Sequence, residues 1–213
     1  MKESRVSFSS GRLVLEGILT IPEGAGSFPV VIVCHPHPLY GGNMDNNVVC
    51  ELSETLTQAT LASFRFNFRG VGGSQGKFAQ GIGEEEDVEA AISFISTAKE
   101  VDWQRIGLAG YSAGAGFAMP VGSSDTRIKA LAGVSPPVNM FDFEFLESCL
   151  KPRLLISGSR DDLIPISQFL KFCRNLPEPR ECVSIEGADH FWWGYESRLA
   201  TEVTDFFSRV LQV

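Results

Sequence analysis

The sequence predicts an α/β fold with a mostly parallel central sheet, and three observations carry that prediction. The run of β-branched residues at 30–34 is typical of a strand buried on both faces. Comparable runs alternate with segments of helical periodicity, which places helices on both faces of the sheet. Residues 6–21 differ, because partial alternation on either side of Gly11 indicates two antiparallel N-terminal strands.

The remaining elements follow from periodicity and from residues that begin or end helices. We expect further strands at residues 63–68, 106–109, 128–134, 153–157 and 181–185. Helices are expected over residues 48–59, from residue 84 onward, over 113–121 and 166–173, and along the C-terminal segment. Asp45 is the predicted N-cap of the first helix. The acidic run 84–87 suits the start of the second helix, because negative charge is favourable there.

Length and composition predict a single domain over residues 1–213. A chain of 213 residues buries about 70% of its unfolded surface, so its core needs neither a metal nor a disulfide. The net charge of −8 repels phosphate backbones and anionic lipid, so neither nucleic acid nor membrane is an expected partner.

Cysteine usage and the first residues indicate a cytoplasmic protein. The five cysteines are odd in number and lack a CxxC or metal-type spacing, which suits a reducing compartment. Residues 1–5 include no apolar signal segment, and the apolar run 30–34 is far too short to span a bilayer.

The sharpest chemical signal is the G-x-S-x-G at residues 110–114, centred on Ser112. A strand-like run precedes it and a helix-like run follows, which is the context of a nucleophile elbow. Gly110, Gly114 and Gly116 leave room around a serine in a strained backbone conformation. The following helix directs free N–H groups at developing negative charge. The alternative is a glycine-rich packing turn with a bystander serine.

A serine nucleophile needs a base, and the chain has three histidines. His190 follows the last predicted strand, whereas His35 and His37 follow the strand at 30–34, so all three lie at the carboxyl edge of the sheet. We predict His190 as the base because an acid can precede it in the right place. For the rings of His35 and His37 we favour structural hydrogen bonds over catalysis, and without a third ligand we expect no metal site.

The acid that orients the imidazole is expected after the strand at 153–157. Asp161 and Asp162 both lie there, and we favour Asp161, with Asp162 as the alternative. The chain order is then serine, aspartate, histidine, as expected for a strand–turn–helix nucleophile on a parallel sheet.

These motifs resemble the α/β-hydrolase superfamily, and particularly its small, lidless branch of dienelactone-hydrolase-like esterases marked by an HPHP loop. The resemblance runs through residues 35–42, 66–72, the Ser112 elbow, 158–165 and 190–191. It implies the α/β-hydrolase fold. The superfamily's acid loop, G-x-x-D-x-x-V-P, matches residues 158–165 with isoleucine replacing valine, which supports Asp161.

The resemblance also implies an oxyanion hole made by the N–H of Ala113 and an N–H of the loop after the third strand. The prolines in that loop have no N–H, which leaves His37, Leu39 and Tyr40. The position within the motif favours His37.

Residues 135–151 leave no room for a full lid domain, so we expect an open site for small or exposed acyl groups. Tyr40, Phe141, Phe191 and Trp192 are the predicted lining of an apolar acyl pocket; the alternative for each is the core or an interface.

The predicted function is hydrolysis of small carboxylic esters through an acyl-enzyme intermediate, with a small-molecule acyl substrate and no cofactor. A thioesterase or peptidase using the same three residues is the main alternative, and a non-catalytic binding module is the next. The oligomeric state is not predicted.

Overall fold

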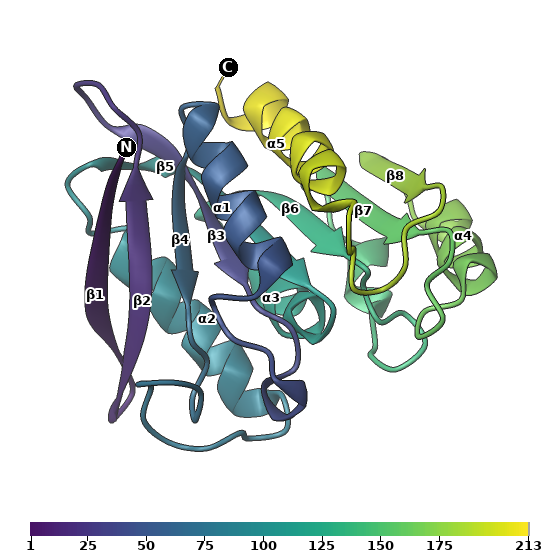
Figure 1. Cartoon of the computed structure of the whole chain (residues 1–213), viewed down its shortest axis with the longest axis horizontal. Coiled ribbons are helices and arrows are strands. Elements are labelled where there is room, and N and C mark those ends of the chain that lie inside the picture. Colours follow the sequence, from purple (N-terminus) through teal and green to yellow (C-terminus); the bar gives the residue numbers. More distant parts are fainter. Residues whose placement is uncertain (213) are drawn as a thin grey trace.

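The computed structural model describes residues 1–212, which are built around one eight-stranded sheet (Figure 1). The order across the sheet is β1-β2-β4-β3-β5-β6-β7-β8. β2 is antiparallel to both β1 and β4, and all other neighbours are parallel. The predicted fold class is therefore confirmed. The strands are β1 (Lys2–Ser10), β2 (Leu13–Ile21), β3 (Phe28–Cys34), β4 (Ala62–Phe66), β5 (Val101–Tyr111), β6 (Ile128–Val134), β7 (Arg153–Gly158) and β8 (Arg180–Ile185).

Helices cover both faces of this sheet. α1 and α5 pack against each other on one face, and α2, α3 and α4 cover the opposite face (Figure 1). The helices are α1 (Asn47–Gln58), α2 (Ile82–Ile95), α3 (Ala113–Ser124), α4 (Ile166–Asn175) and α5 (Glu196–Leu211). Among residues 1–212, every helix is too short or too polar to span a lipid bilayer.

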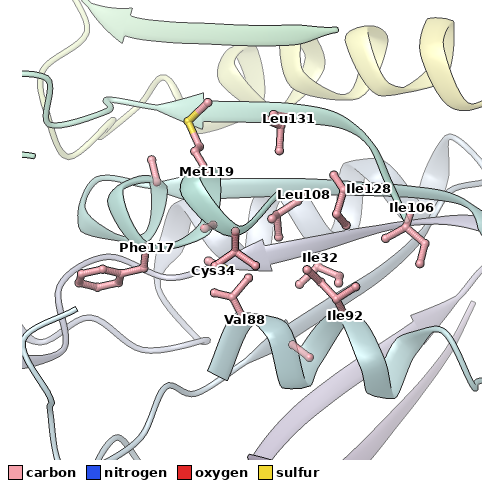
Figure 2. Close-up of a cluster of buried hydrophobic side chains, with 14 of the residues drawn as sticks. Ile32, Cys34, Val88, Ile92, Ile106, Leu108, Phe117, Met119, Ile128 and Leu131 are labelled. Atoms are coloured by element: carbon pink, nitrogen blue, oxygen red, sulfur yellow. The ribbon is translucent and has the colours of Figure 1, made fainter. Parts of the chain in front are cut away.

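The core lies in two layers, and β3 explains why its sequence reads as one apolar run. Val31 and Val33 belong to the layer under α1 and α5, whereas Ile32 and Cys34 belong to the layer under α2 and α3. Figure 2 shows part of the second layer, in which side chains of α2 point toward Ile32 and Cys34 of β3. Because both faces are covered, every position of the strand favours an apolar side chain.

The N-terminal hairpin and the first helix differ in detail from the sequence prediction. β1 and β2 are longer than expected and turn at Gly11, whose φ is +57°. The N-cap of α1 is Asn46 rather than Asp45: the Asn46 side chain accepts the Val48 N–H at 3.0 Å. The Asp45 carboxylate instead pairs with Arg65, so the adjacent asparagine caps the helix.

The connection between β6 and β7 contains no lid domain. Residues 135–152, all described by the structure, include only one short 3₁₀ helix, at Glu144–Glu147. The carboxyl edge of the sheet is therefore left open beside β5, as expected.

Candidate active site

The three predicted chemical residues meet at the carboxyl edge of the sheet. Ser112 follows β5, Asp161 lies three residues after β7, and His190 lies in the loop after β8. Because parallel strands bring their carboxyl ends to one edge, residues far apart in the chain become neighbours there.

Ser112 occupies a strained turn between β5 and α3. Its φ is +53° and its ψ is −124°, a conformation that non-glycine residues rarely adopt. Its N–H donates to the carbonyl of Val134 at 2.8 Å, which holds the turn. A Cβ at Gly114 would lie 2.4 Å from the His35 carbonyl oxygen, and one at Gly110 would lie 2.4 Å from the Gly114 carbonyl oxygen. Both glycines are therefore required by close backbone packing.

A chain of hydrogen bonds joins the three side chains. His190 Nε2 lies 3.0 Å from Ser112 Oγ, and His190 Nδ1 lies 2.8 Å from Asp161 Oδ2. An ionised carboxylate only accepts, so Nδ1 carries the proton and Nε2 is free to accept from the serine hydroxyl. The second oxygen of Asp161 accepts the N–H groups of Leu163 (3.0 Å) and Ile164 (2.7 Å), which fixes the carboxylate. Asp161 and His190 are buried, whereas Asp162 is exposed.

The loop that carries His190 is held by groups that the sequence analysis did not single out. The Tyr111 hydroxyl donates to the His190 carbonyl at 2.7 Å. Burial raises the pKa of Tyr111, so its hydroxyl remains a donor at any physiological pH. Asp189 Oδ1 accepts the N–H groups of Phe191 and Trp192, each at 2.9 Å. Tyr111 directly precedes Ser112, and this adjacency in the sequence could have indicated that Tyr111 belongs to the site.

His35 is a structural residue of the neighbouring loop. Its Nδ1 donates to the Pro36 carbonyl at 2.7 Å, and its Nε2 accepts the Phe68 N–H at 3.1 Å. Burial lowers the pKa of His35 to about 4. Both ring nitrogens are thus occupied by backbone groups, in agreement with the structural role preferred for it.

The backbone N–H groups of the loop after β3 differ in whether they have hydrogen-bond partners. Leu39 N–H donates to His37 Nδ1 at 3.1 Å, and Tyr40 N–H donates to the His37 carbonyl at 3.0 Å. Two of the three candidate donors are therefore used within the turn. Within residues 1–212, the N–H of His37 and that of Ala113 have no hydrogen-bond partner, and both residues line the cavity beside Ser112. Burial lowers the pKa of His37, which keeps Nδ1 available as an acceptor.

An apolar cavity of about 600 Å³ opens beside Ser112. Tyr40, Phe141 and Phe191 line it, as expected from the sequence. Further lining residues that the sequence did not reveal are Asn46, Pro137, Met140, Leu163 and Ile164. No lysine or arginine is among the lining residues, and residues 1–212 place no group of three or more metal-ligating side chains together.

Trp192 corrects the sequence prediction. It is fully buried among α5 residues such as Leu199 and Val203, and it does not line the cavity. Its φ of +63° turns the chain so that the indole points inward, and its Nε1–H donates to Ser135 Oγ at 3.1 Å. Trp193, the next residue, is 68% exposed. Trp192 is therefore a core residue that anchors the loop carrying His190 to the layer under α1 and α5.

Comparison with known proteins identifies the family. No family model matches the chain. An α/β serine hydrolase homologue from Coxiella burnetii is 35% identical and superposes with a TM-score of 0.88, over 96% of this chain and 97% of that one. The chain belongs to the α/β-hydrolase superfamily.

Two further solved structures share the fold of this α/β hydrolase. A serine hydrolase without a lid, from Xanthomonas campestris, is 26% identical with a TM-score of 0.88, covering 100% of this chain and 97% of that one. A dienelactone hydrolase from Anabaena variabilis shares the fold at 22% identity, with a TM-score of 0.83 and coverage of 99% and 98%. Like the Xanthomonas campestris protein, this α/β hydrolase has no lid domain, since residues 135–152 between β6 and β7 include only one short 3₁₀ helix.

Proposed function

We propose that this α/β hydrolase cleaves small carboxylic esters, with Ser112 as nucleophile, His190 as general base and acid, and Asp161 as the group that orients His190. The observation that carries the proposal is the unbroken series of contacts from Asp161 Oδ2 through the imidazole to Ser112 Oγ, at 2.8 and 3.0 Å. A bystander serine would need neither this contact nor the strained backbone.

In the first half of the reaction Ser112 Oγ attacks the ester carbonyl. His190 Nε2 takes the hydroxyl proton as the bond forms, and the imidazolium is stabilised by the carboxylate of Asp161. His190 then returns the proton to the leaving alcohol as the acyl-enzyme forms. Water, activated by the same imidazole, attacks the acyl-enzyme in the second half and releases the acid.

Two backbone amides are available for the oxyanion. The N–H of Ala113 lies at the N-terminus of α3, and the N–H of His37 belongs to a turn stiffened by Pro36 and Pro38. Fixed donors of this kind are each worth about 3 kcal/mol of transition-state stabilisation. We assign both amides to the oxyanion hole.

The cavity lining indicates the acyl group. Met140, Phe141 and Leu163 present apolar surface, and among the lining residues no cation is available to pair with a substrate carboxylate. An uncharged, apolar acyl group of small size therefore fits best. The open edge beside β5 leaves the leaving group in solvent, so leaving groups of different sizes are accommodated.

The test compares substrates that share one acyl group. p-Nitrophenyl butyrate, the butyryl thioester of N-acetylcysteamine and butyryl p-nitroanilide report ester, thioester and amide cleavage with the same butyryl moiety. We expect the oxygen ester to be turned over best. Ser112→Ala should lower its kcat by about 10⁴-fold or more, while the matched exposed serine variant Ser167→Ala should retain wild-type activity.

A fluorophosphonate separates the remaining outcomes. Covalent labelling of the peptide containing Ser112, lost in Ser112→Ala, is the expected result. Faster cleavage of the thioester would indicate a thioesterase, and faster cleavage of the anilide would indicate a peptidase. Folded protein that neither labels nor turns over any of the three substrates would indicate a binding module and overturn the proposal.

A further inference from the structure

Two thiols meet far from the proposed active site, at the β8 edge of the sheet. Cys173 lies in the last turn of α4 and is 4% exposed, whereas Cys182 lies in β8 and is exposed. α4 packs against β8, and the thiols of Cys173 and Cys182 lie near enough to shift each other's pKa. The pair joins an inner thiol to an outer one that solvent reaches.

The strand register independently places both sulfurs on the same face. Cys182 is the parallel partner of Leu155 in β7, so the two side chains point to the same side of the sheet. Leu155 belongs to the core layer that also contains Phe169 and Cys173 of α4. The Cys182 side chain is thus directed toward α4.

A buried cation lies in β7, the strand that pairs with β8. Arg153 is fully buried, and its guanidinium donates only to carbonyl oxygens: those of Cys149 at 2.7 Å, Lys151 at 3.3 Å and Pro177 at 2.6 Å. Within residues 1–212 no carboxylate forms an ion pair with it. The uncompensated charge of Arg153 is therefore available to a nearby anion.

The same surroundings act on the titration of Cys182. Hydrogen bonding to Cys173 lowers the pKa of the Cys182 thiol, the charges of Arg180 and Arg153 act in the same direction, and burial and the carboxylate of Glu178 oppose them. That hydrogen bond and burial raise the pKa of Cys173, which stays protonated. A thiolate that is accessible and stabilised by cations is the reactive form of cysteine.

We propose that Cys173 and Cys182 form a peroxide-reactive thiol pair that closes reversibly into a disulfide between α4 and β8. Cys182 is the attacking thiol and Cys173 is the resolving thiol. The cross-link would join the helix that follows the Asp161 loop to the strand that precedes the His190 loop. The proposal is independent of the hydrolytic function.

The chemistry balances with hydrogen peroxide as the oxidant. The Cys182 thiolate attacks one peroxide oxygen, the O–O bond breaks, and the products are a sulfenic acid and hydroxide. The Cys173 sulfur then attacks the sulfenic sulfur, and the S–O bond breaks as the disulfide forms. The released hydroxyl and the Cys173 proton leave as water. Overall, two thiols are oxidised and one peroxide is reduced to two waters.

The experiment treats the folded, full-length protein with hydrogen peroxide and blocks remaining thiols with N-ethylmaleimide at low pH. We expect the intact mass of a sample taken before alkylation to fall by about 2 Da for the two hydrogens lost. Trypsin should then release residues 172–174 joined to residues 181–198, and dithiothreitol should separate the two peptides. Cys182→Ser should abolish the cross-link, and Cys173→Ala should leave Cys182 as a sulfenic or more oxidised acid.

Cys50 provides a control that lies outside the thiol pair. Cys50 is half-buried in α1, and burial raises its pKa, so Cys50→Ser should form the cross-link at the wild-type rate. Recovery of Cys182 as a sulfinic or sulfonic acid in wild-type protein, with Cys173 free, would overturn the proposal. A disulfide that joins other cysteines, or one that persists in Cys182→Ser, would overturn it equally.

Discussion

Two loops at the same edge of the sheet each hold a histidine, yet their surroundings differ in kind. The loop after β8 holds His190 between a carboxylate and a hydroxyl, so its imidazole has a proton donor on one side and an acceptor on the other. The loop after β3 holds His35 between two backbone groups, which occupy both ring nitrogens.

The difference shows that location at the carboxyl edge does not by itself assign a chemical role. What distinguishes the two imidazoles is whether a reacting side chain is bonded to the ring. The His190 ring can pass a proton from Ser112, whereas protonation of the His35 ring would only break the contact with the Phe68 N–H.

Replacement of each histidine by glutamine should separate the two imidazoles most clearly. His190→Gln should lower kcat on p-nitrophenyl butyrate by about 10⁴-fold or more, because glutamine takes no proton. His35→Gln should instead cost about 1–3 kcal/mol of unfolding free energy, because a buried hydrogen bond to the Pro36 carbonyl is lost. Steady-state kinetics and urea denaturation measure the two effects; a large activity loss with unchanged stability in His35→Gln would contradict the comparison.

The two adjacent aspartates provide the next test. Asp161→Asn should lower kcat by about 10³- to 10⁴-fold, because an amide cannot hold the imidazole in the tautomer that accepts from Ser112. Asp162→Asn is the matched control and should change kcat by no more than about twofold, since that side chain is exposed. Equal losses in the two variants would show that the orienting acid has been misassigned.

The amide of His37 is tested by a proline substitution. The φ of His37 is −55°, which proline adopts without strain, so His37→Pro removes the N–H and keeps the backbone. We expect kcat to fall by about 10²- to 10³-fold with little change in KM. His37→Ala removes the imidazole, as His37→Pro does, but keeps the backbone N–H. We expect this variant to lower kcat by about tenfold or less. Similar kcat values for the two variants would indicate that a group other than the His37 N–H donates to the oxyanion.

The buried imidazole of His35 should also make the stability of the protein depend on pH. Its native pKa is about 4, whereas an unfolded histidine titrates near about 6.5. The unfolded chain therefore binds more protons between these values, so the unfolding free energy falls as pH drops from about 6.5 to about 4. The full effect is about 3 kcal/mol and is absent above about pH 7. Urea denaturation at several pH values in this range measures the unfolding free energy of the wild-type protein and of His35→Gln. The same dependence on pH in both proteins would contradict the prediction.

Much of this architecture was predictable because the signals are local. The β3 run, the glycines around Ser112 and the proline of the acid loop each reflect a backbone requirement that a few neighbouring residues reveal. Each of Ser112, Asp161 and His190 follows a predicted parallel strand, so the sequence also predicted that they meet at one edge of the sheet.

The features that the sequence did not reveal depend on the direction in which single residues point. Adjacent tryptophans at 192 and 193 are indistinguishable by type, and only the positive φ of Trp192 turns that indole into the core. The choice of Asn46 over Asp45 as a cap depends on the position of Arg65, which is distant in sequence. Lining residues such as Met140 come from a loop with no periodicity to interpret.

The open wall of the cavity has a consequence for how such an enzyme changes over generations. Tyr40, Met140, Leu163 and Phe191 are exposed and contribute nothing to either core layer, so substitutions there are tolerated at little thermodynamic penalty. Gly110 and Gly114 allow no such freedom. Substitutions are therefore tolerated mainly on the surface that we propose contacts the acyl group, where single changes can alter substrate preference without destabilising the fold.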